Sequence, residues 1–173
     1  MHYTDTFAAA PDVTVSRTLQ ALACGLGWER RTYDVSTAYL QADATSDEDR
    51  IPLIYPKGMA KYDYRGNELR GVLISNLYGH PAAGARWAKT RDTWILDFFN
   101  NEETSRGWRV YQCHSDPCLF VFDSPDHVTS LVLIYVDDVD SVGPDDTHLK
   151  CIRDCFNERF TSASGPGVRY GAS

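Results

Sequence analysis

Residues 130–136, with the sequence Ser-Leu-Val-Leu-Ile-Tyr-Val, constrain the fold of this chain more than any other segment. Alternate residues of a strand point to opposite faces of the sheet, so a run that is apolar on both faces must be covered on both. The sequence therefore predicts a central strand here rather than an edge strand. Asp137 and Asp138 interrupt the run, and residues 139–143 are able to return beside it as the second strand of a hairpin.

The spacing of apolar residues predicts the other elements. Apolar residues recur at helical intervals in three segments, and shorter apolar runs between turn residues read as strands. Helices are expected over 13–26, 83–100 and 145–160, a short helical or turn-like segment over 36–42, and strands over 30–35, 51–55, 69–75, 119–122, 130–136 and 139–143. Residues 45–50, 57–68 and 100–107 are expected to be loops, and 164–173 a flexible tail without a packing signal. Mixed helices and strands with an antiparallel final pair indicate an α+β fold.

Composition fits one globular domain, because 43% of the 173 residues are apolar and 24% are charged. No run approaches the roughly 20 apolar residues of a membrane-spanning helix, and the first residues lack the pattern of a signal peptide. The chain is therefore expected to be intracellular, neither secreted nor membrane-spanning. Its five cysteines, an odd number, are expected to be reduced thiols.

Asp137 and Asp138 need a physical explanation where they stand. Two adjacent carboxylates repel each other, and burial at the end of an apolar strand disfavours their charged forms further. A divalent cation removes this conflict, and hard oxygen ligands suit Mg²⁺ or Mn²⁺. The alternative is a solvated hairpin tip that happens to be acidic, since Asp is common in turns.

A second acidic motif, around Asp34, favours the first explanation. Together the two motifs resemble the reverse transcriptase of copia-type long-terminal-repeat retrotransposons, an RNA-directed DNA polymerase, and the resemblance covers roughly residues 3–160. The matching segments, in the family's order, are Asp5-Thr-Phe-Ala, Arg17-Thr-Leu, Gly27-Trp-Glu, Asp34-Val-Ser-Thr-Ala-Tyr-Leu, Pro56-Lys-Gly-Met, Asn76-Leu-Tyr-Gly-His, Arg86-Trp, Ser115-Asp-Pro-Cys-Leu-Phe, and Tyr135-Val-Asp-Asp followed by Val142-Gly-Pro.

The resemblance implies a right-hand polymerase palm with part of the fingers over residues 1–163, in which an antiparallel sheet carries the Tyr-Val-Asp-Asp hairpin. It implies that Asp34, Asp137 and Asp138 are the catalytic metal ligands, with two Mg²⁺ or Mn²⁺ ions serving nucleotidyl transfer. Tyr39 would stack beneath the incoming sugar and exclude a 2′-hydroxyl. The nucleotide-binding residues would be Tyr39, Tyr135, Val136 and Ala82, and residues 76–87 would support the template and the incoming base pair.

Three departures from the family pattern bear on activity. Ala82 stands where the family has a polar residue, and Gly84 stands where a proline is common. Asp140 replaces an apolar residue, so the return strand carries a carboxylate that is strained unless it is paired or solvated. The chain also lacks counterparts of the family's basic fingers strand, primer grip and thumb, so the isolated chain is expected to be weak or inactive.

The net charge of −7 is the opposite of what a nucleic-acid-binding domain usually carries. The resemblance explains it, because fingers and thumb would supply most of the basic surface that holds an RNA template and a DNA primer. Partners implied by the family are that template–primer, deoxynucleotides, and the integrase and ribonuclease H of the same polyprotein, in a cytoplasmic particle or the nucleus. The alternative is an inactive copy kept as a structural or binding subunit, with a protein partner covering an exposed apolar surface.

A zinc site is not expected, although Cys113, Cys118, Cys151 and Cys155 come in pairs near His114 and His148. Structural zinc sites prefer tighter cysteine pairs, commonly separated by two residues. The spacing instead favours buried thiols, which pack as small apolar side chains.

Overall fold

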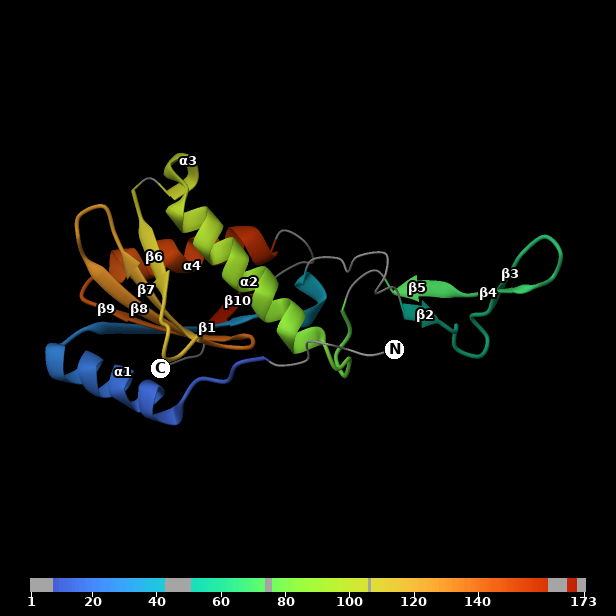
Figure 1. The fold of residues 1–173 in the computed structure, drawn as a ribbon, viewed down its shortest axis with the longest axis horizontal. Helices are drawn as coiled ribbons and strands as arrows, with labels where there is room; N and C mark the ends of the chain where they lie inside the picture. The colour runs from blue at the N-terminus through green and yellow to red at the C-terminus, as the bar shows by residue number, and fades with distance from the viewer. Residues whose placement is uncertain (1–7, 43–50, 74–75, 106, 162–167, 171–173) are drawn as a thin grey trace.

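One six-stranded antiparallel sheet organises the chain in the computed structural model, which describes residues 8–42, 51–73, 76–105, 107–161 and 168–170 (Figure 1). Its strand order is β10-β1-β9-β8-β7-β6. These strands are β1 (Glu29–Val35), β6 (Arg109–Gln112), β7 (Leu119–Asp123), β8 (Thr129–Tyr135), β9 (Asp138–Gly143) and β10 (Val168–Tyr170). The predicted central position of the apolar strand is confirmed, because β8 lies between β7 and β9.

Helices cover both faces of this sheet (Figure 1). The helices are α1 (Val13–Leu26), α2 (Ala83–Asn100), α3 (Glu102–Ser105) and α4 (Asp146–Thr161), with a short 3₁₀ helix η1 (Ala38–Gln41). The larger core lies between the sheet and α2 and α4, and includes Trp87, Phe99, Phe120, Phe122, Ile134, Ile152, Phe156 and Phe160, each at most 1% exposed. The smaller core lies under α1 and joins Leu19 and Ala23 to Leu133 and Val142. All three predicted helices are therefore present. α2 and α4 bury their apolar faces, whereas α1 buries Leu19 and Ala23 and leaves Leu22 and Leu26 exposed.

Local capping sets the ends of α1. The Asp12 side chain accepts a hydrogen bond from the backbone N–H of Thr14 at 2.7 Å, which satisfies one of the free donors at the helix start. Gly27 ends the helix with φ of 64°, a left-handed conformation that favours glycine. The Asp12 N–H also donates to Asp116 at 3.0 Å, so the start of α1 is tied to the loop before β7.

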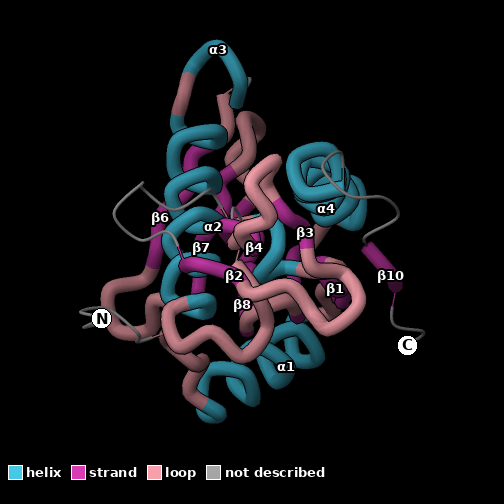
Figure 2. The backbone as a smooth tube through the Cα atoms, turned by 90° about the vertical axis from the view of Figure 1, so that its right-hand side faces the viewer, coloured by secondary structure: helices cyan, strands magenta, loops and turns pink. Residues whose placement is uncertain are grey.

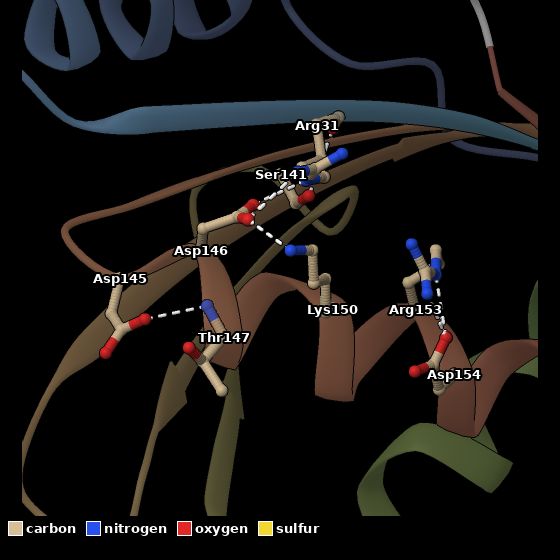
Figure 3. A network of polar contacts seen from close by, with 8 residues as sticks. All are labelled: Arg31, Ser141, Asp145, Asp146, Thr147, Lys150, Arg153 and Asp154. Carbon is tan, nitrogen blue, oxygen red and sulfur yellow. Dashed lines mark hydrogen bonds and ion pairs between the residues drawn. The ribbon is translucent and has the colours of Figure 1, made fainter.

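Ion pairs attach α4 to the sheet (Figure 3). Asp146, at the first residue of α4, accepts hydrogen bonds from Arg31 of β1 and from Lys150 one turn further along. These hydrogen bonds hold the pKa of the Asp146 carboxyl well below its usual value. The Ser141 hydroxyl donates to the Arg31 carbonyl at 3.0 Å, so β1, β9 and α4 meet at this point.

Residues 51–73 form an arm that projects from the sheet (Figures 1 and 2). It consists of two short antiparallel pairs, β2 (Ile51–Leu53) with β5 (Gly71–Leu73) and β3 (Lys61–Tyr62) with β4 (Glu68–Leu69). Seven large apolar or aromatic side chains are exposed along it: Leu53, Ile54, Met59, Tyr62, Tyr64, Leu69 and Val72. The arm therefore presents an apolar surface that the described residues do not cover.

Several predicted loops and boundaries were wrong. The single strand expected over 69–75 is divided between β4 and β5, and the loop expected over 57–68 contains β3. The loop expected over 100–107 contains α3, whose first turn carries Glu102 and Glu103, and β6 follows without having been predicted. These elements have two to four residues, too few for a period to show in the sequence. The predicted acidic loop at 45–50 lies outside the described residues.

The prediction of a flexible tail over 164–173 is also wrong for the part that the structure describes. Residues 168–170 form β10, which pairs antiparallel with β1. The physical reason is the edge of the sheet, where β1 would otherwise expose unpaired backbone N–H and C=O groups. Since backbone pairing needs no apolar pattern, the sequence carried no signal for it.

Candidate active site

The antiparallel register of the sheet brings the two acidic motifs together. Asp34, near the end of β1, lies directly opposite Asp138 at the start of β9. The backbone N–H of Val35 donates to the carbonyl of Asp137 at 2.8 Å, so the hairpin turn is hydrogen-bonded to β1 at the same place. Three carboxylates from segments a hundred residues apart thus share one end of the sheet.

Strained backbone flanks these acids on both sides. Val136, in the turn between β8 and β9, has φ of 54°, and Thr37, just after β1, has φ of 55°. Both are β-branched residues, for which this conformation costs about 1–2 kcal/mol. Such strain persists only where surrounding contacts enforce it, and it gathers at functional sites.

Trp87 supplies one of the enforcing contacts. Its indole Nε1–H donates to the carbonyl oxygen of Val136 at 2.6 Å, and the ring is only 1% exposed. Val136 itself packs against the larger core rather than pointing into solvent. A hydrogen bond from a residue of α2 therefore holds the turn that carries Asp137 and Asp138.

A cavity of about 410 Å³ adjoins Asp34 and Asp138 on the face of the sheet that α1 covers. Its floor includes Thr32 and Arg30 of β1, Asp140 of β9 and Tyr135 of β8, and the start of α1 forms part of its wall. Tyr135 is half exposed and pairs in register with Asp138. Of the predicted nucleotide-binding residues, Tyr135 thus lines this cavity.

A pair of tyrosines, Tyr39 and Tyr78, comes close to two of the acids through Tyr78. Tyr39 of η1 packs on Tyr78, with ring centroids 4.9 Å apart and planes tilted by 43°. Desolvation raises the pKa of the Tyr78 hydroxyl, and the negative charges of Asp137 and Asp34 raise it further. Asp34 therefore lines the cavity and also lies within electrostatic reach of Tyr78.

The start of α2 borders the tyrosine pair. A Cβ atom built on Gly84 would lie 3.8 Å from the Tyr39 hydroxyl and 3.1 Å from the Ala8 side chain, so the glycine leaves room there. Ala82, predicted to contact nucleotide, is the N-cap residue of α2; its side chain is 4% exposed and gives no capping hydrogen bond. Asn76 is 2% exposed and accepts a hydrogen bond from Arg86 at 3.2 Å, which joins the segment before α2 to the helix.

The acids fit a divalent cation in donor chemistry and in backbone register. Carboxylate oxygens are the ligands that Mg²⁺ and Mn²⁺ prefer, and Asp34 and Asp138 sit on paired strands with Asp137 adjacent. Among the described residues, however, no three His, Cys, Asp or Glu side chains are grouped so that they could hold a metal ion. The backbone thus sets the three positions, and binding would require the side chains to converge.

The cysteines do not behave uniformly. All five are free thiols, and Cys118 matches the expected buried type: it is 1% exposed, donates to the Ala9 carbonyl at 3.3 Å, and burial raises its pKa to about 11. The expectation was wrong for Cys151, which is exposed. Ile152 and Phe156 of α4 turn toward the core, so Cys151, the residue before Ile152, faces solvent.

Sequence reasoning missed three residues of this site. Tyr78 and Trp87 were noted only within longer segments, and Arg30 only as the start of a strand. Arg30 forms a two-point ion pair with Asp140, at 2.8 and 3.0 Å, which supplies the partner that this carboxylate was expected to need. Strand alternation places both on one face, but their contact depends on the register between β1 and β9, which the sequence alone does not fix.

Comparison with known proteins supports an origin in a retrotransposon polyprotein. The chain is 28% identical over 144 residues to the retrovirus-related Pol polyprotein from transposon TNT 1-94 of Nicotiana tabacum. The match covers 83% of this chain but only 10% of that protein, so the chain spans about a tenth of the relative's length. No family model and no solved structure matches the chain. Within the described residues, no helix combines the length and the apolarity needed to cross a membrane.

Proposed function

We propose that this chain is the palm, with part of the fingers, of the reverse transcriptase of a copia-like retroelement. In this role it would extend a DNA primer on an RNA template by nucleotidyl transfer, as part of a larger polyprotein. The observation that carries the proposal is the pairing of Asp34 with Asp138 across β1 and β9, with Asp137 in the adjoining strained turn. The similarity to a Pol polyprotein is consistent with this assignment.

The three carboxylates would hold the divalent cations. Bound Mg²⁺ or Mn²⁺ would stabilise the attacking 3′ oxygen and the departing pyrophosphate. The protein's contribution is rigid placement: β1 fixes Asp34, while the hydrogen bonds of the turn to Val35 and Trp87 fix Asp137 and Asp138. Preorganised positions reduce the cost of gathering like charges around a cation.

The tyrosine pair would bind the sugar of the incoming nucleotide. Tyr39 packs on Tyr78, which lies within electrostatic reach of Asp137 and Asp34, and this position would suit packing beneath a ribose ring. In this role its ring would exclude a 2′-hydroxyl, so deoxynucleotides would be preferred. A smaller side chain at this position would then admit ribonucleotides.

The acidic surface would limit how tightly the isolated chain holds nucleic acid. Phosphate contacts supply most non-specific affinity, and the net charge of −7 opposes them. Activity is therefore expected to be weak at physiological salt and stronger at low salt. The integrase and ribonuclease H of the same polyprotein are the partners that this proposal implies.

The proposal is tested by divalent-cation-dependent extension of a primed RNA template. The wild-type chain and an Asp137→Asn, Asp138→Asn double variant are compared in Mn²⁺ or Mg²⁺ at low salt, with circular dichroism confirming that both are folded. We expect extension by the wild type and a loss of at least about a hundredfold in the variant. Equal extension by both proteins, or none by the folded wild type, would contradict the proposal.

A second candidate is a catalytically inactive copy retained as a structural or binding subunit. The exposed apolar side chains of the arm favour it, because Ile54 is 70%, Met59 67% and Tyr64 87% exposed. Large exposed apolar patches mark surfaces that a partner covers. A folded wild-type chain that does not extend primers under any cation condition would favour this candidate over the first.

A further inference from the structure

Asp140 places a fourth carboxylate beside the proposed cation site. Alternate residues of β9 point to the same face, so Asp138, Asp140 and Val142 all lie on the side that α1 covers. Asp138 and Asp140 line the same cavity, and two residues along a strand separate them by about 7 Å. The side chain of Asp140 is only 17% exposed, so solvent screens its charge incompletely.

Arg30 holds this carboxylate with two hydrogen bonds. Its Nε–H donates to one oxygen of Asp140 at 2.8 Å, and an Nη2–H donates to the other at 3.0 Å. A two-point pair of this kind fixes the direction of the carboxylate as well as neutralising it. Both oxygens of Asp140 are thereby engaged by a single guanidinium.

The register of β1 and β9 shows where that pair points. Asp34 lies opposite Asp138, Thr32 opposite Asp140, and Arg30 opposite Val142. Arg30 therefore lies one row beyond Asp140, on the side away from Asp138. Its hydrogen bonds draw the Asp140 carboxylate along the sheet, away from the end where the other acids gather.

We propose that Arg30 is a positioning residue that keeps Asp140 out of the divalent-cation site, so that only Asp34, Asp137 and Asp138 take part in it. This inference rests on the proposed function, because it assumes that these three acids bind a cation. Without Arg30, Asp140 is an unpaired carboxylate within reach of an ion at Asp138. Without Asp140, the Arg30 guanidinium is free to pair with the remaining acids and to compete with the cation.

The two losses therefore act in opposite directions on cation affinity. A released carboxylate about 7 Å away strengthens the attraction for a divalent ion, and a released guanidinium weakens it, each by about threefold to tenfold. Replacing both Arg30 and Asp140 removes both effects and returns the affinity for the divalent cation close to that of the wild type. A purely structural role for Arg30 would only weaken binding, so a gain in affinity distinguishes positioning from stability.

The test is titration of each protein with Mn²⁺, with free Mn²⁺ measured by electron paramagnetic resonance. The variants are Arg30→Gln, Asp140→Asn and the double variant, with the Asp137→Asn, Asp138→Asn protein defining binding outside the site. Arg31→Gln is the matched control, because Arg31 is also paired with an aspartate, Asp146, but points to the α4 face of the sheet. We expect Arg30→Gln to bind Mn²⁺ about threefold to tenfold more tightly, Asp140→Asn more weakly to the same extent, and Arg31→Gln within about twofold of wild type.

The outcomes separate the inference from the proposed function. If the wild-type chain binds no Mn²⁺ beyond the double Asn protein, the proposed function is overturned and this inference with it. If the wild type binds Mn²⁺ but Arg30→Gln does not bind it more tightly, the inference alone is overturned. The same holds if the Arg30→Gln, Asp140→Asn protein binds Mn²⁺ as tightly as Arg30→Gln does. Should Arg30→Gln fail to fold, the weakening expected of Asp140→Asn decides the question, and unchanged affinity there overturns the inference.

Discussion

Replacing Trp87 with phenylalanine tests how the acidic turn is held. The substitution removes the indole N–H that donates to the Val136 carbonyl at 2.6 Å and keeps an aromatic ring in the core. A buried carbonyl left without its donor costs about 1–3 kcal/mol, and the smaller ring adds about 1 kcal/mol of lost packing. The two costs together are about 2–4 kcal/mol, and since 1 kcal/mol corresponds to about 2–4 °C for a domain of this size, we expect the Tm to fall by about 4–16 °C.

The control is Trp94→Phe, in the same aromatic cluster. Trp94 packs against Phe98, Phe99, Phe156 and Phe160 but donates no hydrogen bond to any described residue. Thermal unfolding and Mn²⁺ titration are measured on both variants at equal concentration. We expect the Trp87 variant to lose more stability than the control and also to bind Mn²⁺ more weakly, because the turn is less well fixed. Equal loss of stability and equal Mn²⁺ affinity in both variants would refute the account of the turn.

Three further predictions concern the surrounding fold. Gly143→Ala is expected to lower stability by about 1–3 kcal/mol in thermal or urea unfolding, because its Cβ would lie 2.5 Å from the Ser130 hydroxyl; an unchanged midpoint would contradict this close approach. Asp146→Asn is expected to be less stable than wild type at neutral pH, with a difference that shrinks as the pH falls below about 4. The hydrogen-bonded carboxylate has a lowered pKa in the folded state, so its contribution to stability is present above the unfolded pKa of 3.8 and is lost as the pH falls through the pKa of the folded state. A difference in Tm between variant and wild type that stays constant with pH would contradict this. Alkylation of the native chain followed by mass spectrometry should modify exposed Cys24 much faster than buried Cys118, whose pKa is raised to about 11, and equal rates would contradict the burial.

Apolar patterns that extend over many residues predicted the main helices and the central strand of the fold. Helices α1 and α2 begin and end at the residues predicted from apolar spacing, and Asp12 and Gly27 cap the two ends of α1. The central place of β8 followed from its two apolar faces. β3, the division of the strand expected over 69–75 into β4 and β5, β6 and β10 were missed, because backbone pairing over two to four residues leaves no pattern in the side chains.

The sequence allowed the acidic residues of the site to be predicted, but not the side-chain contacts that hold them in place. Asp137 and Asp138 could be selected because adjacent carboxylates after an apolar strand need an explanation, and Asp34 through the resemblance of its segment to the family motif. The bond from Trp87 to the turn depends on how α2 packs on the sheet, and the pairing of Arg30 with Asp140 depends on strand register. Both contacts arise from tertiary packing and strand register, and patterns in a single sequence do not show which residues will form them.

Primer extension by an Asp34→Asn variant is the decisive measurement for the proposed site, because the pairing of β1 with β9 brings Asp34 to the other acids. The matched control is Asp97→Asn, on the exposed face of α2. We expect wild type and Asp97→Asn to extend a primed RNA template equally in Mn²⁺, while Asp34→Asn loses at least about a hundredfold with its fold intact by circular dichroism. Extension by the Asp34 variant at the rate of the Asp97 control would contradict the proposed site.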